Sequence, residues 1–223
     1  DSSVMALAVL PDDRLAAGCG DGKVRVVDVE VGAVAAVLES GRHGVAALAV
    51  LPDGTLASTF QGGEVRLWDV GRKVCVAELG RHTSMVQSLT MLADGRLACG
   101  FWWGQVALWD IGTRTRVGTM AGNGYRYSNS VGALAALPDG RLVSGPILGG
   151  LVQLWDTRPA AAAAAAASSR AASSAVPLTA LAHIPDPADS STTRLVPLQD
   201  GRVACTYDTD VFLLEVPPPV VYE

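Results

Sequence analysis

Residues 51–70 read LPDGTLASTFQGGEVRLWDV, and this stretch decides the fold. Its Pro-Asp-Gly has turn chemistry, because proline presets φ at the first corner and glycine accepts a positive φ. This turn separates two apolar runs, 45–51 and 55–60, and a Gly-containing turn at 61–64 leads to a third. A fourth apolar run follows the closing Asp69 after a short polar link. Short runs joined by tight turns predict a meander of four antiparallel strands.

Five stretches of the chain carry this pattern. Each closes on an acidic residue, and the spacings between successive closing residues are 41, 41, 46 and 59. Two equal periods followed by two longer ones indicate one repeat unit that carries loop insertions in its later copies. The closing residues are Asp28, Asp69, Asp110, Asp156 and Glu215.

Strand runs such as 45–51 are apolar at nearly every residue, whereas a half-exposed sheet would alternate between apolar and polar residues. Both faces of each sheet are therefore expected to be covered. Small residues such as Ala47 and Ala49 suit strands that are crowded near an axis. Four-stranded sheets that pack face to face around a central channel meet these conditions, so the sequence predicts an all-β fold, a β-propeller.

The units resemble WD40 repeats, and the resemblance covers residues 4–216. Arg42-His43 and Arg81-His82 stand in the place of the family's Gly-His dipeptide. The resemblance implies a WD40-type β-propeller with about five four-stranded antiparallel blades. Three units close on the family's Leu-Trp-Asp, at 67–69, 108–110 and 154–156.

The resemblance implies a single propeller domain over residues 1–223. Seven blades are the family norm, so we expect either a five-bladed ring or, as we favour, an incomplete part of a seven-bladed ring cut from a longer polypeptide. A low-complexity Ala/Ser tract at 158–177 is predicted to be a surface loop, and 178–184 the outer strand of the fourth unit. The expected blades are approximately 1–39, 40–80, 81–120, 121–184 and 185–223.

In the family, a loop His, a strand Ser or Thr, a turn Asp and the Trp form a hydrogen-bonded structural tetrad. The second unit offers His43, Ser58 and Trp68, but Gly62 stands where the turn Asp belongs. The third unit has Trp103 at that position. No unit carries the whole tetrad. This counts against the hydrogen-bonded network but not against the propeller.

Composition excludes several classes of partner. The chain has 223 residues, of which 49% are apolar and 17% charged, and its formal net charge is −5. This balance argues against a phosphate-backbone binder, which needs clustered Lys and Arg. No run approaches about 20 apolar residues, the length that a membrane helix requires. The expected partners are other proteins or peptides, with no nucleic acid and no membrane.

The four cysteines lie far apart and form no Cys-x-x-Cys pair. Each stands in an apolar run, where a free thiol acts as a small hydrophobe. We expect buried, reduced thiols rather than disulfides or metal ligands, and therefore a reducing compartment. The expected location is the cytoplasm, with a nuclear or a cytoskeletal or ciliary assembly as alternatives. The cysteines are Cys19, Cys75, Cys99 and Cys205.

The sequence predicts neither catalytic residues nor a cofactor or metal site. His43 and His82 recur at equivalent positions of the repeat, which favours structural hydrogen bonding over catalysis. The carboxylates also recur with the repeat, as turn-capping groups do. The Gly-rich segments precede strands and lack the helix N-terminus that binds phosphate. We therefore predict that the protein is not an enzyme.

One turn departs from the repeat. Where other units have small or polar residues, the third unit has Phe101-Trp102-Trp103-Gly104. Tryptophan, tyrosine and arginine are enriched at interface hot spots. In WD40 propellers this turn and the His-bearing loop open on the same face, so the resemblance predicts a partner-binding rim there. Its candidate residues are Trp102, Trp103, Tyr125, Arg126, Tyr127, Arg42 and Arg81.

Two readings of the tryptophan pair stay open at this point: exposure as a binding anchor, or packing between neighbouring blades. The predicted function is a non-catalytic protein–protein interaction scaffold, a propeller that docks partners within a larger complex. The alternative is a substrate-receptor or regulatory module of a ubiquitin ligase that recognises short peptide motifs through Arg clusters.

Overall fold

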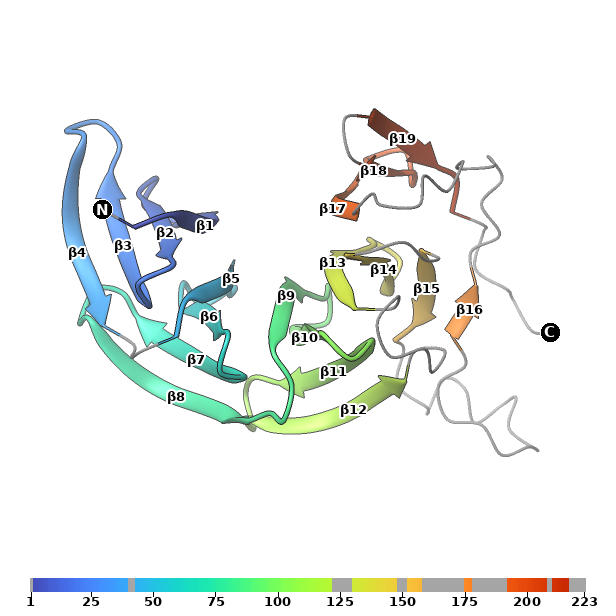
Figure 1. The fold of residues 1–223 in the computed structure, drawn as a ribbon, viewed down its shortest axis with the longest axis horizontal. Helices are drawn as coiled ribbons and strands as arrows, with labels where there is room; N and C mark the ends of the chain where they lie inside the picture. The colour runs from blue at the N-terminus through green and yellow to red at the C-terminus, as the bar shows by residue number, and fades with distance from the viewer. Residues whose placement is uncertain are drawn as a thin grey trace.

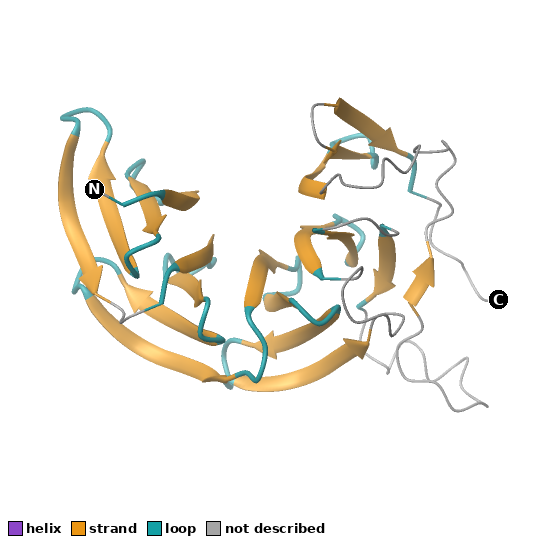
Figure 2. Ribbon diagram, viewed as in Figure 1, coloured by secondary structure: helices purple, strands orange, loops and turns teal. Residues whose placement is uncertain are grey.

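The computed structural model describes residues 2–39, 43–121, 130–147, 152–157, 175–177, 192–207 and 210–216. Within these ranges the chain forms strands and no helix, which confirms the predicted all-β fold (Figure 2). The strands make four four-stranded sheets and one three-stranded sheet, and all pairs are antiparallel. The described residues contain no helix long and apolar enough for a membrane span.

Within every sheet the strands are paired in chain order, as the predicted meander requires. The first and second sheets comprise β1 (Val4–Val9), β2 (Leu15–Cys19), β3 (Lys23–Asp28), β4 (Ala33–Glu39), β5 (Val45–Val50), β6 (Leu56–Phe60), β7 (Glu64–Asp69) and β8 (Val74–Arg81). The third comprises β9 (Val86–Met91), β10 (Arg96–Phe101), β11 (Gln105–Asp110) and β12 (Thr115–Ala121). The fourth comprises β13 (Val131–Ala136), β14 (Arg141–Pro146), β15 (Gln153–Asp156) and β16 (Ala175–Pro177), and the fifth β17 (Thr192–Pro197), β18 (Val203–Tyr207) and β19 (Asp210–Leu214).

The five sheets follow one another around an arc (Figure 1). The first strand of each sheet, β1, β5, β9, β13 and β17, lies on the inside of the arc, and β4, β8 and β12 lie on the outside (Figure 1). Neighbouring sheets stand face to face, so each side of an inner sheet is covered by another sheet. This arrangement is the radial packing of a β-propeller.

The Pro-Asp-Gly turns form as their chemistry predicts. In the second sheet, the Gly54 amide donates to the Leu51 carbonyl at 2.9 Å, and Gly54 has φ +83°. The Asp53 side chain accepts the Thr55 amide at 2.9 Å, which stabilises the corner. The same bond recurs in the other four sheets at 3.0–3.1 Å, with Gly95, Gly140 and Gly201 as donors in the third to fifth sheets and Asp13 as the donor in the first. The repeated turn therefore fixes where β1, β5, β9, β13 and β17 each end.

Among the described residues the buried apolar side chains form four clusters, and each cluster joins two neighbouring sheets. Val24 and Val26 of the first sheet pack with Val45 and Phe60 of the second, and all four are at most 2% exposed. Burial of this kind contributes about 1.5–3 kcal/mol for each large apolar side chain. The continuous apolar runs of the sequence are explained by this burial on both faces of the inner sheets.

Two details differ from the sequence-based expectations. The outer strand of the fourth sheet is β16 at Ala175–Pro177, inside the tract expected to be a loop and ahead of the strand expected at 178–184, which lies outside the described residues. All four cysteines are free, but Cys75 is exposed, so the expectation that every thiol is buried is wrong for it. Cys75 lies on the outermost strand β8, where no neighbouring sheet covers it.

Candidate protein-interaction site

The turn between β10 and β11 carries the tryptophan pair. The Gly104 amide donates to the Phe101 carbonyl at 3.0 Å, and Gly104 has φ +78°, so Trp102 and Trp103 occupy the two corners of the turn. The Trp102 amide also donates to the Met85 carbonyl at 3.0 Å. We call Phe101–Gly104 the tryptophan turn. Its backbone is held at both ends by a sheet, which fixes the backbone positions of the two tryptophans.

The same turn recurs in the first two sheets with different corner residues. Residues 19–22 and 60–63 close with Gly-to-carbonyl bonds of 3.1 and 2.9 Å, and both glycines have positive φ. Their corners hold Gly20 and Asp21 in the first sheet, and Gln61 and Gly62 in the second. The three turns have the same backbone conformation, but only the turn of the third sheet has tryptophans at its corners.

Trp103 is 55% exposed, and it is the one aromatic side chain among the exposed large hydrophobic residues that the structure describes. Trp102 is half-buried, and Phe101 is 5% exposed. Of the two readings left open by the sequence, packing between blades does not apply to Trp103. A large indole left in water is a source of binding energy for a partner.

Beneath the turn, aromatic contacts connect Phe101 to His82 and Trp109. The His82 ring lies edge-on to Phe101, with ring centroids 4.7 Å apart, and edge-on to Trp109 at 5.5 Å. Burial, together with the charge of Arg116, lowers the pKa of His82 below its usual value. His82 is therefore a neutral, half-buried packing group under the turn, and its Nε2 has no hydrogen-bond partner among the described residues.

The repeat tryptophans differ in how their indole N–H is satisfied. Trp68 donates to Ser58 Oγ at 2.7 Å, and Trp155 donates to Ser144 Oγ at 2.8 Å. In the third sheet, Cys99 occupies the position of these serines. Trp109 Nε1 has no hydrogen-bond acceptor among the described residues. The Ser–Trp part of the family tetrad is therefore present in two sheets and lost in the third.

Gly62 has a structural role that the sequence did not reveal. A Cβ at this position would collide with the Glu64 carboxylate and the His43 imidazole. Glu64 is 5% exposed. The Glu64 carboxylate thus lies beside His43, where the family's turn Asp would lie. Glu64 itself stands two residues after Gly62 in the sequence. The sequence signal for this role was the acidic residue that immediately follows the Gly-Gly pair.

A second feature missed by sequence reasoning is the Asp-x-Arg pair at the opposite turns. Each arginine pairs with the aspartate two residues before it, at distances of 2.5–2.6 Å. The ion pairs hold the pKa of Asp12, Asp94 and Asp200 below the usual value. Arg96 also donates to the Thr157 carbonyl, which joins the third sheet to the fourth. The pairs are Asp12–Arg14, Asp94–Arg96, Asp139–Arg141 and Asp200–Arg202.

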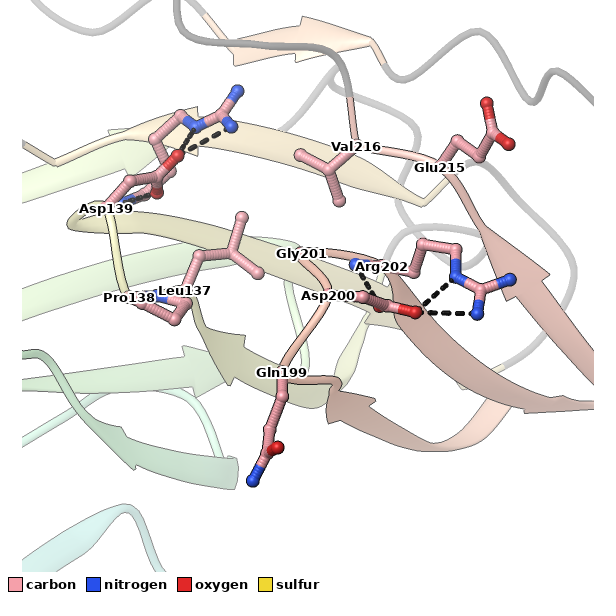
Figure 3. Close-up of a pocket in the computed structure, with 10 residues that line it drawn as sticks. Leu137, Pro138, Asp139, Gln199, Asp200, Gly201, Arg202, Glu215 and Val216 are labelled. Atoms are coloured by element: carbon pink, nitrogen blue, oxygen red, sulfur yellow. Dashed lines mark hydrogen bonds and ion pairs between the residues drawn. The ribbon is translucent and has the colours of Figure 1, made fainter.

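A cleft of about 650 Å³ lies between two of these turns, in the fourth and fifth sheets. Figure 3 shows Leu137 and Val216 between the turns that carry Asp139 and Asp200. Both aspartates are held in ion pairs, with Arg141 and Arg202. Carboxylates neutralised in this way stabilise turns and are not poised for acid–base exchange. Among the residues that the structure describes, no cluster of His, Cys, Asp or Glu could hold a metal ion.

The structure describes only some of the predicted rim residues. The Met85 bond brings the loop that follows Arg81 next to the tryptophan turn, and the His82 amide donates to the Gly63 carbonyl at 3.1 Å. Arg81 ends β8 opposite Glu64, but the placement of its side chain is not described. The other predicted rim residues lie outside the described ranges, and they are Arg42, Tyr125, Arg126 and Tyr127.

The family model described as "WD domain, G-beta repeat" matches residues 1–28 and 73–110. The chain carries WD40 repeats. Among solved structures, 1421 chains match it. One belongs to a "Crystal Structure of Mitotic Checkpoint Complex", with a TM-score of 0.72 and 22% sequence identity over 97% of this WD40 chain.

That likeness shows the fold of the WD40 chain. The match covers 62% of the solved chain, so this protein spans less than two thirds of that chain's length. No curated protein sequence matches. The resemblance stated from the Leu-Trp-Asp closings and the predicted propeller fold are confirmed by the repeat match and the structural match together.

Proposed function

We propose that this WD40 chain is a non-catalytic protein-interaction scaffold that docks partner proteins or peptides through the tryptophan turn. The observation that carries the proposal is the exposure of Trp103, 55%, on a turn whose backbone is bonded into a sheet. Exposed aromatic anchors on a rigid support are what protein interfaces use for hot spots. The repeat match and the propeller fold support the same class of function.

The energetics of association favour this turn. A rigid binding element avoids the cost of ordering a loop on association, and the Gly104 and Trp102 backbone bonds supply that rigidity. Burial of a tryptophan in an interface typically contributes at least about 2 kcal/mol when measured by alanine substitution. Trp103 supplies the exposed anchor, and Trp102 supports it from a half-buried position.

Charge and thiol chemistry support the choice of partner and location. The net charge of −5 favours proteins or peptides over nucleic acid or a membrane. Four free cysteines accord with a reducing compartment, and we place the protein in the cytoplasm. The ubiquitin-ligase alternative, which recognises short peptide motifs through Arg clusters, stays a prediction.

The test replaces the anchor and keeps the fold. The double variant Trp102→Ala, Trp103→Ala and the control Val117→Ala, an exposed apolar residue of β12, are compared in quantitative pull-downs from cell extract. Loss of the anchors is expected to weaken at least one partner by about 2 kcal/mol, roughly 30-fold. The control should leave every partner unchanged. Unaltered capture by a double variant with wild-type thermal unfolding would rule the turn out.

A further inference from the structure

The cleft between the fourth and fifth sheets has apolar side chains at its middle and charged groups around them (Figure 3). Leu137 belongs to the apolar cluster that joins these two sheets, and Val216 packs against that cluster. Leu137 is 4% exposed, and Val216 is half-buried. The volume of about 650 Å³ lies within the range of ligand clefts, roughly 300–1,000 Å³. The cleft therefore has room for a long side chain and the peptide backbone around it.

Five charged side chains line the cleft, and four of them form two ion pairs. Asp139 pairs with Arg141, and Asp200 pairs with Arg202, each at 2.6 Å. The hydrogen bond to Asp200, with a smaller contribution from the charge of Glu215, raises the pKa of Arg202 above its usual value. The fifth charged residue is Glu215. Three carboxylates against two guanidinium groups leave the cleft with one negative charge that no ion pair neutralises.

In the first three sheets, the closing aspartate of the repeat is held by backbone amides. Each of these carboxylates accepts the amide of the residue three positions later, and the first also accepts the amide two positions later. Such bonds stabilise the turn that follows the strand. The acceptors are Asp28, at 3.0 and 3.1 Å, and Asp69 and Asp110, at 2.8 Å each.

Glu215 is the closing residue of the fifth unit, and the sequence after it removes these donors. Pro217 and Pro218 stand two and three positions later, and proline has no N–H to donate. Glu215 is exposed, and no described residue donates a hydrogen bond to its carboxylate. The carboxylate that caps a turn in the first three sheets is therefore available to a ligand at the cleft.

This distribution of charge favours a cationic ligand. An anion would meet three carboxylates, because both guanidinium groups are already paired with aspartates. A cationic head group pairs with Glu215 and leaves both ion pairs intact, and an aliphatic stem covers Leu137 and Val216. Lysine and arginine side chains combine such a stem with such a head group.

The residues that directly follow Val216 do not supply this cation. Residues 217–223 read PPPVVYE and contain no Lys or Arg, and Glu223 would add a further negative charge. This segment is therefore a poor match to the cleft, whereas a basic peptide of another protein matches both its charge and its apolar lining.

We propose that the cleft binds a lysine or arginine side chain in a peptide segment of a partner protein. The head group pairs with Glu215, and the stem packs on Leu137 and Val216. The site goes beyond the proposed function, because it lies at the other end of the strands from the tryptophan turn. Successive turns of an antiparallel meander lie at opposite ends of its strands, so the two sites can fail independently.

Nuclear magnetic resonance titration of the purified, ¹⁵N-labelled chain tests the proposal. The probes are four acetylated and amidated tripeptides that carry lysine, arginine, norleucine or glutamate between two glycines. Norleucine keeps the aliphatic stem without the charge, and glutamate reverses the charge. The amide signals of Gly201, Arg202 and Val216 report on the cleft. Those of Gly63 and Gly104 report on the turns at the other end of the strands.

The lysine and arginine peptides are expected to shift the cleft amides saturably. Their dissociation constants should be at least about tenfold lower than that of the norleucine peptide, which cannot form a charge-assisted hydrogen bond. The glutamate peptide should leave these signals unchanged. Equal affinity for lysine and norleucine, or tighter binding of glutamate, would overturn the proposal. The absence of any saturable shift would also overturn it, because the cleft would then be closed or filled by this polypeptide.

Substitutions of Glu215 separate its charge from the shape of the cleft. Glu215→Gln should lower the affinity for the lysine peptide to that for norleucine, and Glu215→Lys should favour the glutamate peptide instead. Glu30→Gln, at an exposed glutamate of the first sheet, is the matched control and should change nothing. A lysine preference that survives Glu215→Gln would refute the proposal.

The titration is repeated in the Trp102→Ala, Trp103→Ala background. Unchanged binding of the lysine peptide there is expected, and it would stand even if the tryptophan turn proved to bind no partner. Loss of binding in a double variant with wild-type thermal unfolding would refute an independent site in the cleft.

Discussion

The second and third sheets are copies of one repeat that satisfy their buried tryptophans differently. Trp68 of the second sheet donates to Ser58 at 2.7 Å, and the Glu64 carboxylate lies beside His43. In the third sheet Cys99 replaces the serine, and Trp109 contacts the His82 ring instead. Both tryptophans are nonetheless 8% exposed or less. Apolar packing between sheets therefore holds this fold, and the polar network contributes to a sheet without being required for it.

The comparison predicts unequal costs for removing the two tryptophans. Trp68→Ala and Trp109→Ala each leave a large cavity and should lower the free energy of unfolding by about 3–5 kcal/mol. The loss should be about 1 kcal/mol larger for Trp68→Ala, because it also removes a hydrogen bond to Ser58. Urea unfolding measures both. Trp103→Ala, at an exposed site, is the control and should change the value by less than about 0.5 kcal/mol. An equal or greater loss for Trp109→Ala would contradict the comparison.

Ser58→Cys should convert the second sheet to the state of the third. The sulfur is a poor acceptor, so the buried Trp68 N–H loses its partner at a cost of about 1–3 kcal/mol. Urea unfolding again provides the measurement, and near-ultraviolet circular dichroism reports the tryptophan environment. A variant as stable as the parent would show that the Ser58–Trp68 bond contributes nothing.

Cys99→Ser is the reciprocal change and tests whether the third sheet is under-satisfied. The new hydroxyl would lie where Ser58 lies in the second sheet and would accept the Trp109 N–H. We expect the free energy of unfolding to rise by about 0.5–1.5 kcal/mol. The matched Cys205→Ser, in a sheet without a repeat tryptophan, should give no gain. Destabilisation by Cys99→Ser would mean that Trp109 points away from this site.

The smallest effect concerns pH. Burial lowers the pKa of His82 in the folded protein below the unfolded reference of 6.5, so the unfolded chain binds the proton more tightly. The contribution of His82 to stability is complete above pH 6.5 and is lost as the pH falls through the lowered pKa. Thermal unfolding from pH 8 to pH 5 should show this loss in the parent and a smaller one in His82→Gln. Parallel profiles would exclude the titration of His82 as the cause.

The sequence predicted those features that depend on local chemistry and on repetition. The Pro-Asp-Gly turns, the four-strand units and the Leu-Trp-Asp strands all appear in the structure, since each is determined by a few adjacent residues. The Ser58–Trp68 pair followed from the family resemblance. These features were visible because the same residues return at the same places in successive units.

Features that depend on what lies across a turn or beyond a sheet were not predictable. Glu64 replaces a missing aspartate from a different position, which only the three-dimensional path of the chain reveals. The exposure of Cys75 follows from the outermost place of β8, and that of Trp103 from the absence of a covering side chain. β16 lies in an Ala/Ser tract whose low complexity gives no strand periodicity.

The core clusters, each shared by only two successive sheets, have a consequence for how the molecule comes apart. In a linear array with nearest-neighbour coupling, the terminal elements have one supporting neighbour and the central ones have two. Amide hydrogen exchange should then be fastest in β1–β4 and β17–β19 and slowest in β9–β12. Denaturant would unfold such a molecule from its two end sheets toward its middle. A molecule bound to an end sheet would oppose unfolding from that end.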